Sequence, residues 1–365
     1  MNPAAPENLQ RVEKLLEEKG LERVIILGSA NVFFALGTDA APMAIIGDEP
    51  LLIVPRLEYL RALEERVKGR VISVSKNGEF SSYEDGIKGD FYDAIELFLE
   101  GIAPAKIGVV NASKENMTKL SKKLGGKPVD VTQEFKLLRR KKTPKEVELM
   151  EKAARVAEQA MQKAVDNLET GVTEAEVAAE IISLMVKHGY TFSFYPIVAF
   201  GEHAAHPHAK PSLKTLKPGD YVKIDLGAKV GGYCSDMTRT FVYGDASSRQ
   251  KKIYRAVLEA QRSAAEAIRA GVDAAQPYRK AYSVLKKAGL AEYFNHGLGH
   301  GVGVEIHEEP YLSPTYKGKL VAGDVVTNEP GVYMAGYGGV RIEDMLYVDD
   351  EGTRYITFFD TFLEV

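Results

Sequence analysis

Residues 221–243 read YVKIDLGAKVGGYCSDMTRTFVY, and the interpretation of the whole chain starts from this stretch. Valine, isoleucine, tyrosine, threonine and phenylalanine alternate with other residues on both sides of the glycine pair 231–232, a pattern typical of a β-hairpin. If the turn is centred on the peptide bond before Gly231, Asp225 lies directly opposite Asp236. The sequence therefore predicts two carboxylates on one face of one sheet.

The two predicted carboxylates need a positive partner. Facing side chains of antiparallel strands have Cβ atoms roughly 4.5 to 5.5 Å apart, and like charges at that separation destabilise the sheet. The other face of the hairpin should be buried, because it carries Val222, Ile224, Leu226, Met237 and Phe241. Arg239 falls on this apolar face, and the sequence suggests no partner for it. The alternative interpretation is that the two acids lie on a solvated hairpin and bind nothing. Metal ligands of other types elsewhere in the sequence would argue against it.

Length and composition describe an ordinary soluble protein. The chain has 365 residues, 45% hydrophobic and 27% charged, which favours two domains. The net charge of -4 gives no electrostatic reason to expect nucleic acid or an anionic membrane as a partner, and no apolar run approaches the roughly 20 residues of a membrane helix. The single cysteine, Cys234, excludes an internal disulfide and is expected to be a buried filler. Because the N-terminus has no basic, apolar segment, we expect a cytoplasmic protein.

Residues 1–137 are predicted to form an N-terminal α/β domain without a catalytic constellation. We expect helices at 8–19, 57–67, 91–99 and 115–124, and strands at 24–27, 41–46, 51–54, 71–74 and 107–110. The basic run 139–142 is interpreted as a solvated linker near the domain boundary. Thr143, Pro144 and Glu146 then supply an N-cap, a first-turn proline and a capping box, which predict the start of a long helix.

The second domain, residues 138–365, is predicted to contain an internal repeat. Gly171-Val172-Thr173 recurs 100 residues later as Gly271-Val272-Asp273, and each copy follows a long helical segment and offers an N-cap to the next helix. Each half should contain two helices and a hairpin, with the second hairpin between residues 324 and 348. The fold class expected for the chain is α+β, with two similar halves of the second domain closing around a shared site.

Six of the seven histidines lie in two short segments. A lone histidine is more often structural than a ligand, whereas clusters in the same domain as a paired-acid hairpin favour a metal site. The six are His203, His206, His208, His296, His300 and His307. Glycines separate the residues of the second cluster, so the backbone can approach a ligand or a strand closely. Their spacing fails the dinucleotide-binding fingerprint, and Pro310 excludes the helix that a zinc-protease motif at His307 would need.

Further acids lie near the C-terminal end of the sequence. Glu329 lies in a glycine-rich segment, and Glu343 follows Arg341 by two residues. If residues 340–348 form one strand, Arg341 and Glu343 share a face and Asp344 points away. An arginine so placed can hold the carboxylate in one orientation. The alternative interpretation is a surface run of acids.

Together these segments supply four carboxylates and one imidazole: Asp225, Asp236, His300, Glu329 and Glu343. The set is oxygen-rich and negative enough to bind two divalent cations. Such ligands suit Mn²⁺, Co²⁺ or Fe²⁺ better than they suit a structural zinc ion. Two cations about 3.5 to 4 Å apart can share a water molecule and lower its pKa. They can also bind the attacking and the leaving oxygen of a displacement reaction.

In their local context these five residues resemble the ligands of the pita-bread metallopeptidases. His300 lies in Gly-His-Gly-Val-Gly, Glu329 in Glu-Pro-Gly-Val-Tyr and Glu343 in Arg-Ile-Glu-Asp. The resemblance is closest to the proline-specific branch, the Xaa-Pro dipeptidases (prolidases) and Xaa-Pro aminopeptidases, and covers nearly the whole chain. It implies a creatinase-like N-terminal domain, a pita-bread catalytic domain with a pseudo-twofold repeat, and a dinuclear-metal exopeptidase that hydrolyses the Xaa-Pro bond of small peptides.

The resemblance also implies which residue holds which ion. Asp225 would bind one metal, His300 and Glu329 the other, and Asp236 and Glu343 would bridge both. A metal-bridging hydroxide would be the nucleophile. Mn²⁺ or Co²⁺ is expected, with Zn²⁺ or Fe²⁺ as alternatives.

The remaining roles are likewise implied by the resemblance. The catalytic residues would be Glu329, which passes a proton to the leaving imino nitrogen, and His208 and His307, which stabilise the oxyanion. The substrate-binding residues would be His208, His296, His307, Tyr333 and Arg341, with His296 lining the pocket for the proline ring. His203 and His206 have no counterpart in the family.

One departure from the family concerns substrate length. Archaeal-type prolidases tend to have arginine where this sequence has Tyr311, and that arginine is thought to bind the free carboxylate of the dipeptide. Because this arginine is absent, we expect longer Xaa-Pro peptides to be substrates too.

Two alternative functions are those of a methionine-type aminopeptidase and of a non-catalytic peptide-binding module with the same fold. Family members commonly dimerise, so a homodimer is expected.

Overall fold

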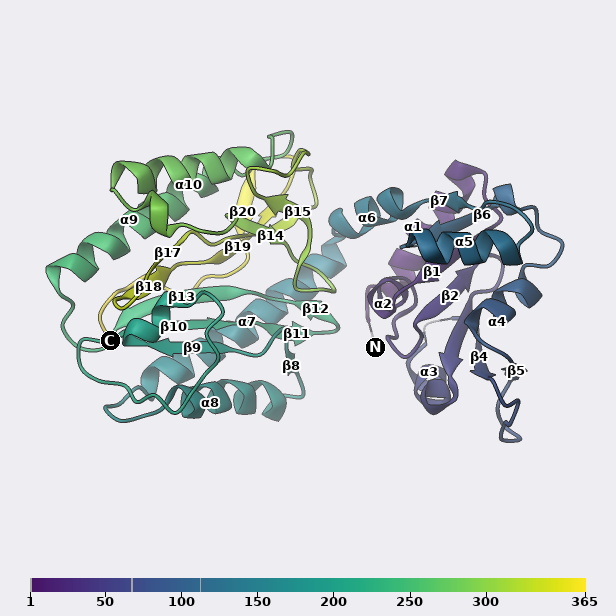
Figure 1. The fold of residues 1–365 in the computed structure, drawn as a ribbon, viewed down its shortest axis with the longest axis horizontal. Coiled ribbons are helices and arrows are strands. Elements are labelled where there is room, and N and C mark those ends of the chain that lie inside the picture. The colour runs from purple at the N-terminus through teal and green to yellow at the C-terminus, as the bar shows by residue number, and fades with distance from the viewer. Residues whose placement is uncertain (1, 67, 112) are drawn as a thin grey trace. The chain divides into compact units, whose positions relative to one another are not determined.

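The computed structural model describes residues 2–66, 68–111 and 113–365, and the chain divides into two compact units (Figure 1). The first unit is Met1–Arg139 and the second is Arg140–Val365. This division falls at the end of helix α6 (Thr132–Arg140), so the boundary expected after residue 137 lies inside that helix. None of the helices formed by the described residues has the length and apolar composition that a membrane crossing requires.

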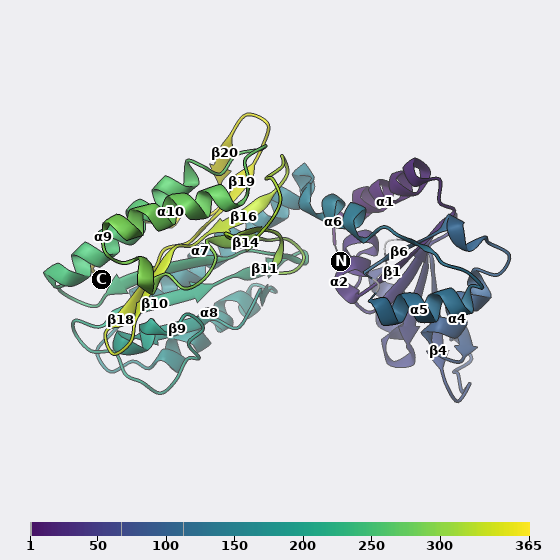
Figure 2. The same cartoon turned by 45° about the horizontal axis from the view of Figure 1, so that its top comes forward.

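Within the described residues, the first unit is built on a mixed sheet in the order β5-β4-β3-β2-β1-β6-β7. Its strands are β1 (Arg23–Leu27), β2 (Met43–Ile46), β3 (Leu51–Pro55), β4 (Arg70–Ser75), β5 (Gly86–Lys88), β6 (Ile107–Val110) and β7 (Val129–Asp130). Its other helices are α1 (Ala5–Lys19), α2 (Ser29–Leu36), α3 (Tyr59–Glu65), α4 (Phe91–Phe98) and α5 (Lys114–Lys123). Alternate strand residues such as Ile25, Ile45 and Val109 pack against Ile95 of α4 and Leu120 of α5, so these helices cover one face of the sheet (Figure 2).

The helices and strands expected in the first unit are present, with ends that differ by up to three residues. The helix expected at 57–67 starts with a 3₁₀ turn, Arg56–Glu58, and its last residue lies outside the described part of the chain. Strands β5 and β7 and helices α2 and α6 are additional. α2 was not predicted because its residues are apolar without a helical period, as suits a segment buried on most sides.

The basic run 139–142 is not a solvated linker, so that interpretation is wrong. Arg140 Nη2 lies 2.7 Å from Oδ2 of the fully buried Asp324. Lys142 Nζ lies 3.3 Å from Glu308 Oε2, and both side chains are buried. The basic residues meet carboxylates more than 160 positions along the chain, which no local pattern could indicate.

The second unit contains the predicted repeat. Each half has a pair of helices: α7 (Pro144–Asp166) with α8 (Glu174–Lys187), and α9 (Ser248–Ala265) with α10 (Ala275–Lys287). The capping box that begins α7 is formed as predicted, between Thr143 and Glu146. The amide of Gly171 donates to Leu216 O, and the amide of Gly271 donates to Leu320 O in the same way.

The second copy departs from expectation at the start of its second helix. Asp273 was expected as the N-cap of α10, but the helix begins at Ala275 with Ala274 as the cap. Asp273 Oδ1 instead accepts a hydrogen bond from the Ala275 amide at 2.9 Å. The carboxylate therefore caps the same helix end from one residue further out.

The strands of the two halves are arranged alike. β10 (Tyr221–Leu226) lies between β9 (Ile197–Phe200) and β13 (Met237–Val242), and β16 (Val325–Asn328) lies between β14 (Gly299–Gly301) and β19 (Asp344–Val348). The further strands are β8 (Thr191–Phe192), β11 (Ala228–Val230), β12 (Tyr233–Cys234), β15 (Glu308–Leu312), β17 (Gly331–Met334), β18 (Gly338–Arg341) and β20 (Thr353–Tyr355). In Figure 1, α9 and α10 lie on one side of these strands and α8 lies on the other. The second hairpin falls at the expected position, between Asp324 and Val348.

The first hairpin has a different register from the one predicted. Asp225 faces Thr238, not Asp236, because the pairing is shifted by two residues. Gly231 and Gly232 have φ of 55° and 84°, so both are corner residues and the turn is centred between them. Asp236 lies outside the strands, directly before β13.

The predicted apolar face of the hairpin is nevertheless buried. Val222, Ile224, Leu226, Met237 and Phe241 all join one apolar core with α7 and α8. Strand parity therefore directs Asp225 to the opposite face. Cys234 is buried and free, as expected, and burial raises the pKa of its thiol to about 11.

Arg239, which had no expected partner, is buried in an ion pair with Asp344. Arg239 Nη2 lies 2.7 Å from Asp344 Oδ1, and Nη1 donates to Glu343 O at 2.6 Å. The guanidinium also donates to Phe359 O. Asp344 does point away from Glu343, as predicted, and the pair joins β13 of the first half to β19 of the second.

Replacing Arg239 with methionine should lower the free energy of unfolding by about 3 to 5 kcal/mol, because it leaves Asp344 buried without its cation. Chemical denaturation followed by circular dichroism measures the change. The matched control is Arg155→Met, which removes a more exposed pair with Glu158 and should cost less than about 1 kcal/mol. Equal losses in the two variants would contradict the assignment.

Candidate metal centre

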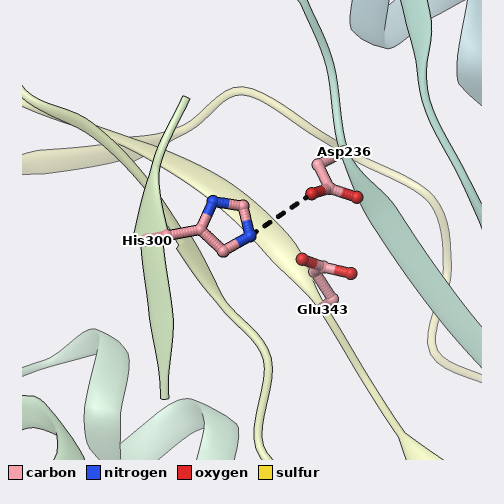
Figure 3. Close-up of side chains that lie close together, drawn as sticks. All are labelled: Asp236, His300 and Glu343. Atoms are coloured by element: carbon pink, nitrogen blue, oxygen red, sulfur yellow. Dashed lines mark ion pairs between the residues drawn. The ribbon is translucent and has the colours of Figure 1, made fainter. Parts of the chain in front are cut away.

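The residues proposed from the sequence as metal ligands converge in the second unit. They come from five segments: Asp225 from β10, Asp236 before β13, His300 from β14, Glu329 after β16, and Glu343 between β18 and β19. Figure 3 shows the side chains of Asp236, His300 and Glu343 pointing toward one another, and their ligand atoms lie within 4.8 Å of each other. All five line one cavity of about 1310 Å³.

The strand that carries His300 fits only because glycines flank it. A Cβ at Gly299 would lie 2.1 Å from Thr327 O, and a Cβ at Gly301 would lie 2.3 Å from Glu309 O. β14 is therefore close to both of its neighbours, and His300 is its only large side chain. This confirms the expected close approach of backbone in the second histidine cluster.

His300 offers a lone pair to the cluster. Its Nδ1 lies 3.1 Å from Gly301 O, and because a carbonyl can only accept, Nδ1 carries the proton. Nε2 then faces carboxylate oxygens at 3.6 Å (Asp236 Oδ2) and 3.3 Å (Glu329 Oε1). A lone pair and carboxylates directed at one another repel unless a proton or a cation lies between them.

The carboxylates of the cluster are buried together, which disfavours their ionisation. Burial, followed by the charge of Glu343, raises the pKa of Asp236 well above its usual value. Burial, followed by the charge of Glu329, does the same to the pKa of Glu343. Burial also raises the pKa of Asp225, although Arg341 opposes it. Burial pushes the pKa of Glu329 upward too, but when a proton rather than a cation lies on His300 Nε2, the hydrogen bond and charge of His300 hold that pKa at about 2.

The donor set fits divalent cations. Among the described residues, Asp225 Oδ1 is buried and has no hydrogen-bond partner, which normally costs free energy. An unpaired carboxylate oxygen, two carboxyls with raised pKa and an unprotonated imidazole nitrogen are the donors that a divalent metal ion satisfies. Four carboxylates and one imidazole make a donor set that consists mostly of oxygen atoms, as the sequence suggested.

Arg341 holds Asp225 and not Glu343, so the expected orientation of Glu343 by this arginine is wrong. Its Nη2 bonds Asp225, Nη1 donates to Tyr333 OH at 2.8 Å, and Nε donates to Thr238 Oγ1 at 3.0 Å. Residues 340–348 are not one strand, because β18 ends at Arg341 and β19 begins at Asp344. Arg341 and Glu343 nevertheless both line the cavity.

Two threonines that the sequence analysis missed hold the carboxylates in place. Thr238 Oγ1 donates to Glu343 Oε2 at 2.6 Å. Thr327 Oγ1 donates to Glu329 Oε1 at 3.2 Å and accepts from the His300 amide. Thr238 could have been found only from the correct hairpin register, since it is the residue that faces Asp225.

The other predicted histidines separate into two groups. His208, His296 and His307 line the cavity with the carboxylates, whereas His203 and His206 line a smaller, separate one. The ring of His307 lies 4.3 Å from that of His300, centroid to centroid. Burial, followed by the charge of His300, lowers the pKa of His307.

Tyr333 lies behind the wall of the cavity and connects His296 to Arg341. Its hydroxyl accepts from Arg341 and lies 3.0 Å from His296 Nε2, to which it donates. His296 Nδ1 then donates to Gly297 O at 2.6 Å. Burial lowers the pKa of His296, in keeping with this neutral form.

Comparisons with known proteins agree with this architecture. Residues 148–350 match the model of metallopeptidase family M24, and residues 8–141 match the creatinase/prolidase N-terminal domain. The Xaa-Pro dipeptidase of Pyrococcus furiosus is 36% identical over 96% of this chain and 97% of its own. The Xaa-Pro dipeptidase from Bacillus anthracis is similar in structure, with a TM-score of 0.85, 29% identity, and coverage of 99% of this chain and 100% of its own.

A solved X-Pro aminopeptidase from Thermotoga maritima is also similar, with a TM-score of 0.87 and 28% identity, covering 98% of this chain and 99% of its own. The family match covers more than half of the chain, and the family uses divalent metal ions. The chain therefore belongs to metallopeptidase family M24, with a creatinase-type N-terminal domain, and it is a metallopeptidase.

Proposed function

We propose that this metallopeptidase is an exopeptidase that hydrolyses the peptide bond before proline in Xaa-Pro substrates, with two divalent cations per chain. The observation that carries the proposal is the convergence of four carboxylates and His300 in one cavity. Relatives named as Xaa-Pro dipeptidases match the chain over almost its whole length, which supports the choice of substrate.

Asp225, Asp236, His300, Glu329 and Glu343 would hold the cations. The buried, unpartnered Oδ1 of Asp225 and the raised pKa values of Asp236 and Glu343 support this set. When bound, the cations lower the pKa of water and act as Lewis acids toward the scissile carbonyl. Oxygen-rich donors favour Mn²⁺ or Co²⁺ over Zn²⁺ or Fe²⁺.

The residues around the cluster would bind the substrate and move the proton. Glu329 Oε1 already accepts from Thr327, so Oε2 would take up the proton and deliver it to the leaving nitrogen. His208 and His307 would donate to the oxygen that becomes negative during attack. His296 would lie beside the proline ring, held by its contact with Tyr333.

The size of the cavity favours peptide substrates longer than dipeptides. Its volume of about 1310 Å³ exceeds the usual range of about 300 to 1,000 Å³ for small-molecule pockets. Tyr311, which replaces the prolidase arginine, lines it and is 42% exposed. We therefore propose activity on longer Xaa-Pro peptides as well. The homodimer, the native metal and the cellular location stay predictions.

A three-substrate assay tests the proposed activity. After reconstitution with Mn²⁺, Co²⁺ or Zn²⁺, the protein should hydrolyse Ala-Pro and Ala-Pro-Ala and leave Met-Ala-Ser intact, as followed by chromatography of the products. Cleavage of Met-Ala-Ser alone would replace the proposal with a methionine-type aminopeptidase. No cleavage and no bound metal would favour a peptide-binding module.

Replacing Asp236 with asparagine should remove bound metal and turnover together. Loss of one ligand should reduce the metal content from about two ions per chain, and kcat/KM for Ala-Pro should fall by about 10³-fold or more, which corresponds to about 4 kcal/mol of barrier. Metal analysis and steady-state kinetics measure both. The control is Asp245→Asn, an exposed carboxylate, which should change neither quantity. Cleavage of Ala-Pro at the parent rate by the Asp236 variant would rule out the ligand set.

Metal binding should release protons and strengthen with rising pH. In the metal-free site, Asp236 and Glu343 have pKa values well above the usual range, so protons compete with the cation until the pH exceeds those values. Calorimetric titration of Mn²⁺ in buffers of different ionisation enthalpy, at about pH 6 and about pH 8, gives the number released, which should be about one to two. Glu343→Gln should release fewer. Affinity that does not vary with pH would contradict this linkage.

A further inference from the structure

Lys223 is a buried cation to which the proposed chemistry assigns no role. It lies in β10, two residues before Asp225, and its side chain is fully buried. Its Nζ lies within hydrogen-bond distance of three main-chain carbonyls, those of Ala204 (3.1 Å), His206 (2.6 Å) and Pro207 (3.4 Å). Among the ion pairs formed by the described residues, Lys223 takes part in none.

Burial of Lys223 costs free energy, and its hydrogen bonds show what the residue does in the structure. Burying an amine or ammonium without a carboxylate partner is unfavourable unless its N–H groups are bonded. Burial lowers the pKa of Lys223, yet in either protonation state its nitrogen donates only to carbonyls of residues 204–207. The nitrogen also lies 5.2 Å from the centre of the Tyr333 ring. The contacts of Lys223 therefore tie this loop to β10.

The carbonyl directly before His208 is held from two strands. Pro207 O accepts from Lys223 on β10 and from Arg341 Nη1 on β18, at 3.3 Å. Arg341 also bonds Asp225. The peptide unit that joins Pro207 to His208 is thus connected to the strands that carry the carboxylates.

The outer part of the same loop is held by a second buried charge. Glu174, the first residue of α8, is fully buried and accepts from the Phe200 amide at 2.8 Å, from Ser212 Oγ at 2.6 Å and from the Ser212 amide at 3.0 Å. His203 Nδ1 lies 2.8 Å from the same carboxylate. This contact explains His203. The part of the loop next to His208 is held instead by Lys223, which bonds the carbonyls of residues 204–207, and by Arg341, which bonds Pro207 O.

We propose that Lys223 is a positioning residue, which holds the main chain of residues 204–207 against β10 and thereby places His208 in the cavity opposite the carboxylates. The inference rests on the proposed role of His208 in binding the scissile carbonyl. Because a displacement of about 1 Å can cost about 100-fold in rate, loss of this attachment should act on turnover more than on stability alone.

The test is Lys223→Met, which keeps the length of the side chain and removes the donors. We expect kcat/KM for Ala-Pro to fall by about 10- to 100-fold, mostly in kcat, with the metal content unchanged. The same substitution in a His208→Ala background should have little further effect, because both changes remove one function. Lys223→Gln, which keeps N–H donors on a shorter side chain, should be intermediate, and it replaces the first variant if that variant does not fold.

Hydrogen exchange supplies a readout that does not depend on activity. Amides of residues 204–212 in the metal-free Lys223→Met protein should exchange faster than in the parent. Met161→Ala, a fully buried change in α7, should lower stability without a selective effect on this loop. If the parent protein fails to cleave Ala-Pro, the proposed function is wrong. Hydrogen exchange then tests by itself whether Lys223 holds residues 204–207 against β10.

Two results would overturn the inference. The first is parent-like exchange of residues 204–212 in the Lys223→Met protein. The second is an equal loss of activity from Lys223→Met with and without His208, because Lys223 would then act on another part of the site.

Discussion

The repulsion among four carboxylates, three of them buried and the fourth, Glu329, partly buried, is the constraint on which the second unit depends. Asp225, Asp236, Glu329 and Glu343 lie in one cavity, and burial with mutual repulsion raises the pKa values of Asp236 and Glu343. Of these four carboxylates, Asp225 forms the ion pair with Arg341, and the lone pair of His300 adds to the need for a cation. A metallopeptidase of family M24 fits this arrangement, because divalent ions remove the repulsion that the protein's own cations leave.

The internal repeat is what brings these acids together. Each half places a central strand between two neighbours, and each supplies two of the carboxylates. The halves differ in detail, since only the second supplies an imidazole to the cluster and only the first carries the loop with His208. Buried cations join the parts: Arg239 bonds Asp344, and Arg341 reaches from β18 to Asp225 on β10. The same charges that position the site therefore also fasten one half to the other.

Much of the fold could be predicted because local patterns determine it. The capping box of Thr143 and Glu146 and the glycine motif that recurs after 100 residues involve neighbours along the chain, and the structure has them as expected. The apolar face of the hairpin also follows from strand parity. The register did not follow, because a shift of the turn centre changes every partner and leaves the alternation intact. Asp225 thus faces Thr238, which then proved to be the hydrogen-bond partner of Glu343.

By itself the sequence determined the alternation of helices and strands, the repeat, and the residue types that suit divalent metal ions, since these depend on composition and on short spacings. Only the tertiary structure decided the partners of the buried charges: Arg140 with Asp324, Arg239 with Asp344, Arg341 with Asp225, and Lys223 with the loop before His208. Most of these partners lie more than 100 residues apart, and any acid would satisfy a basic residue equally well in the sequence. The choice among them is made by which side chains share a dry interior, where an unpaired charge is too costly to leave.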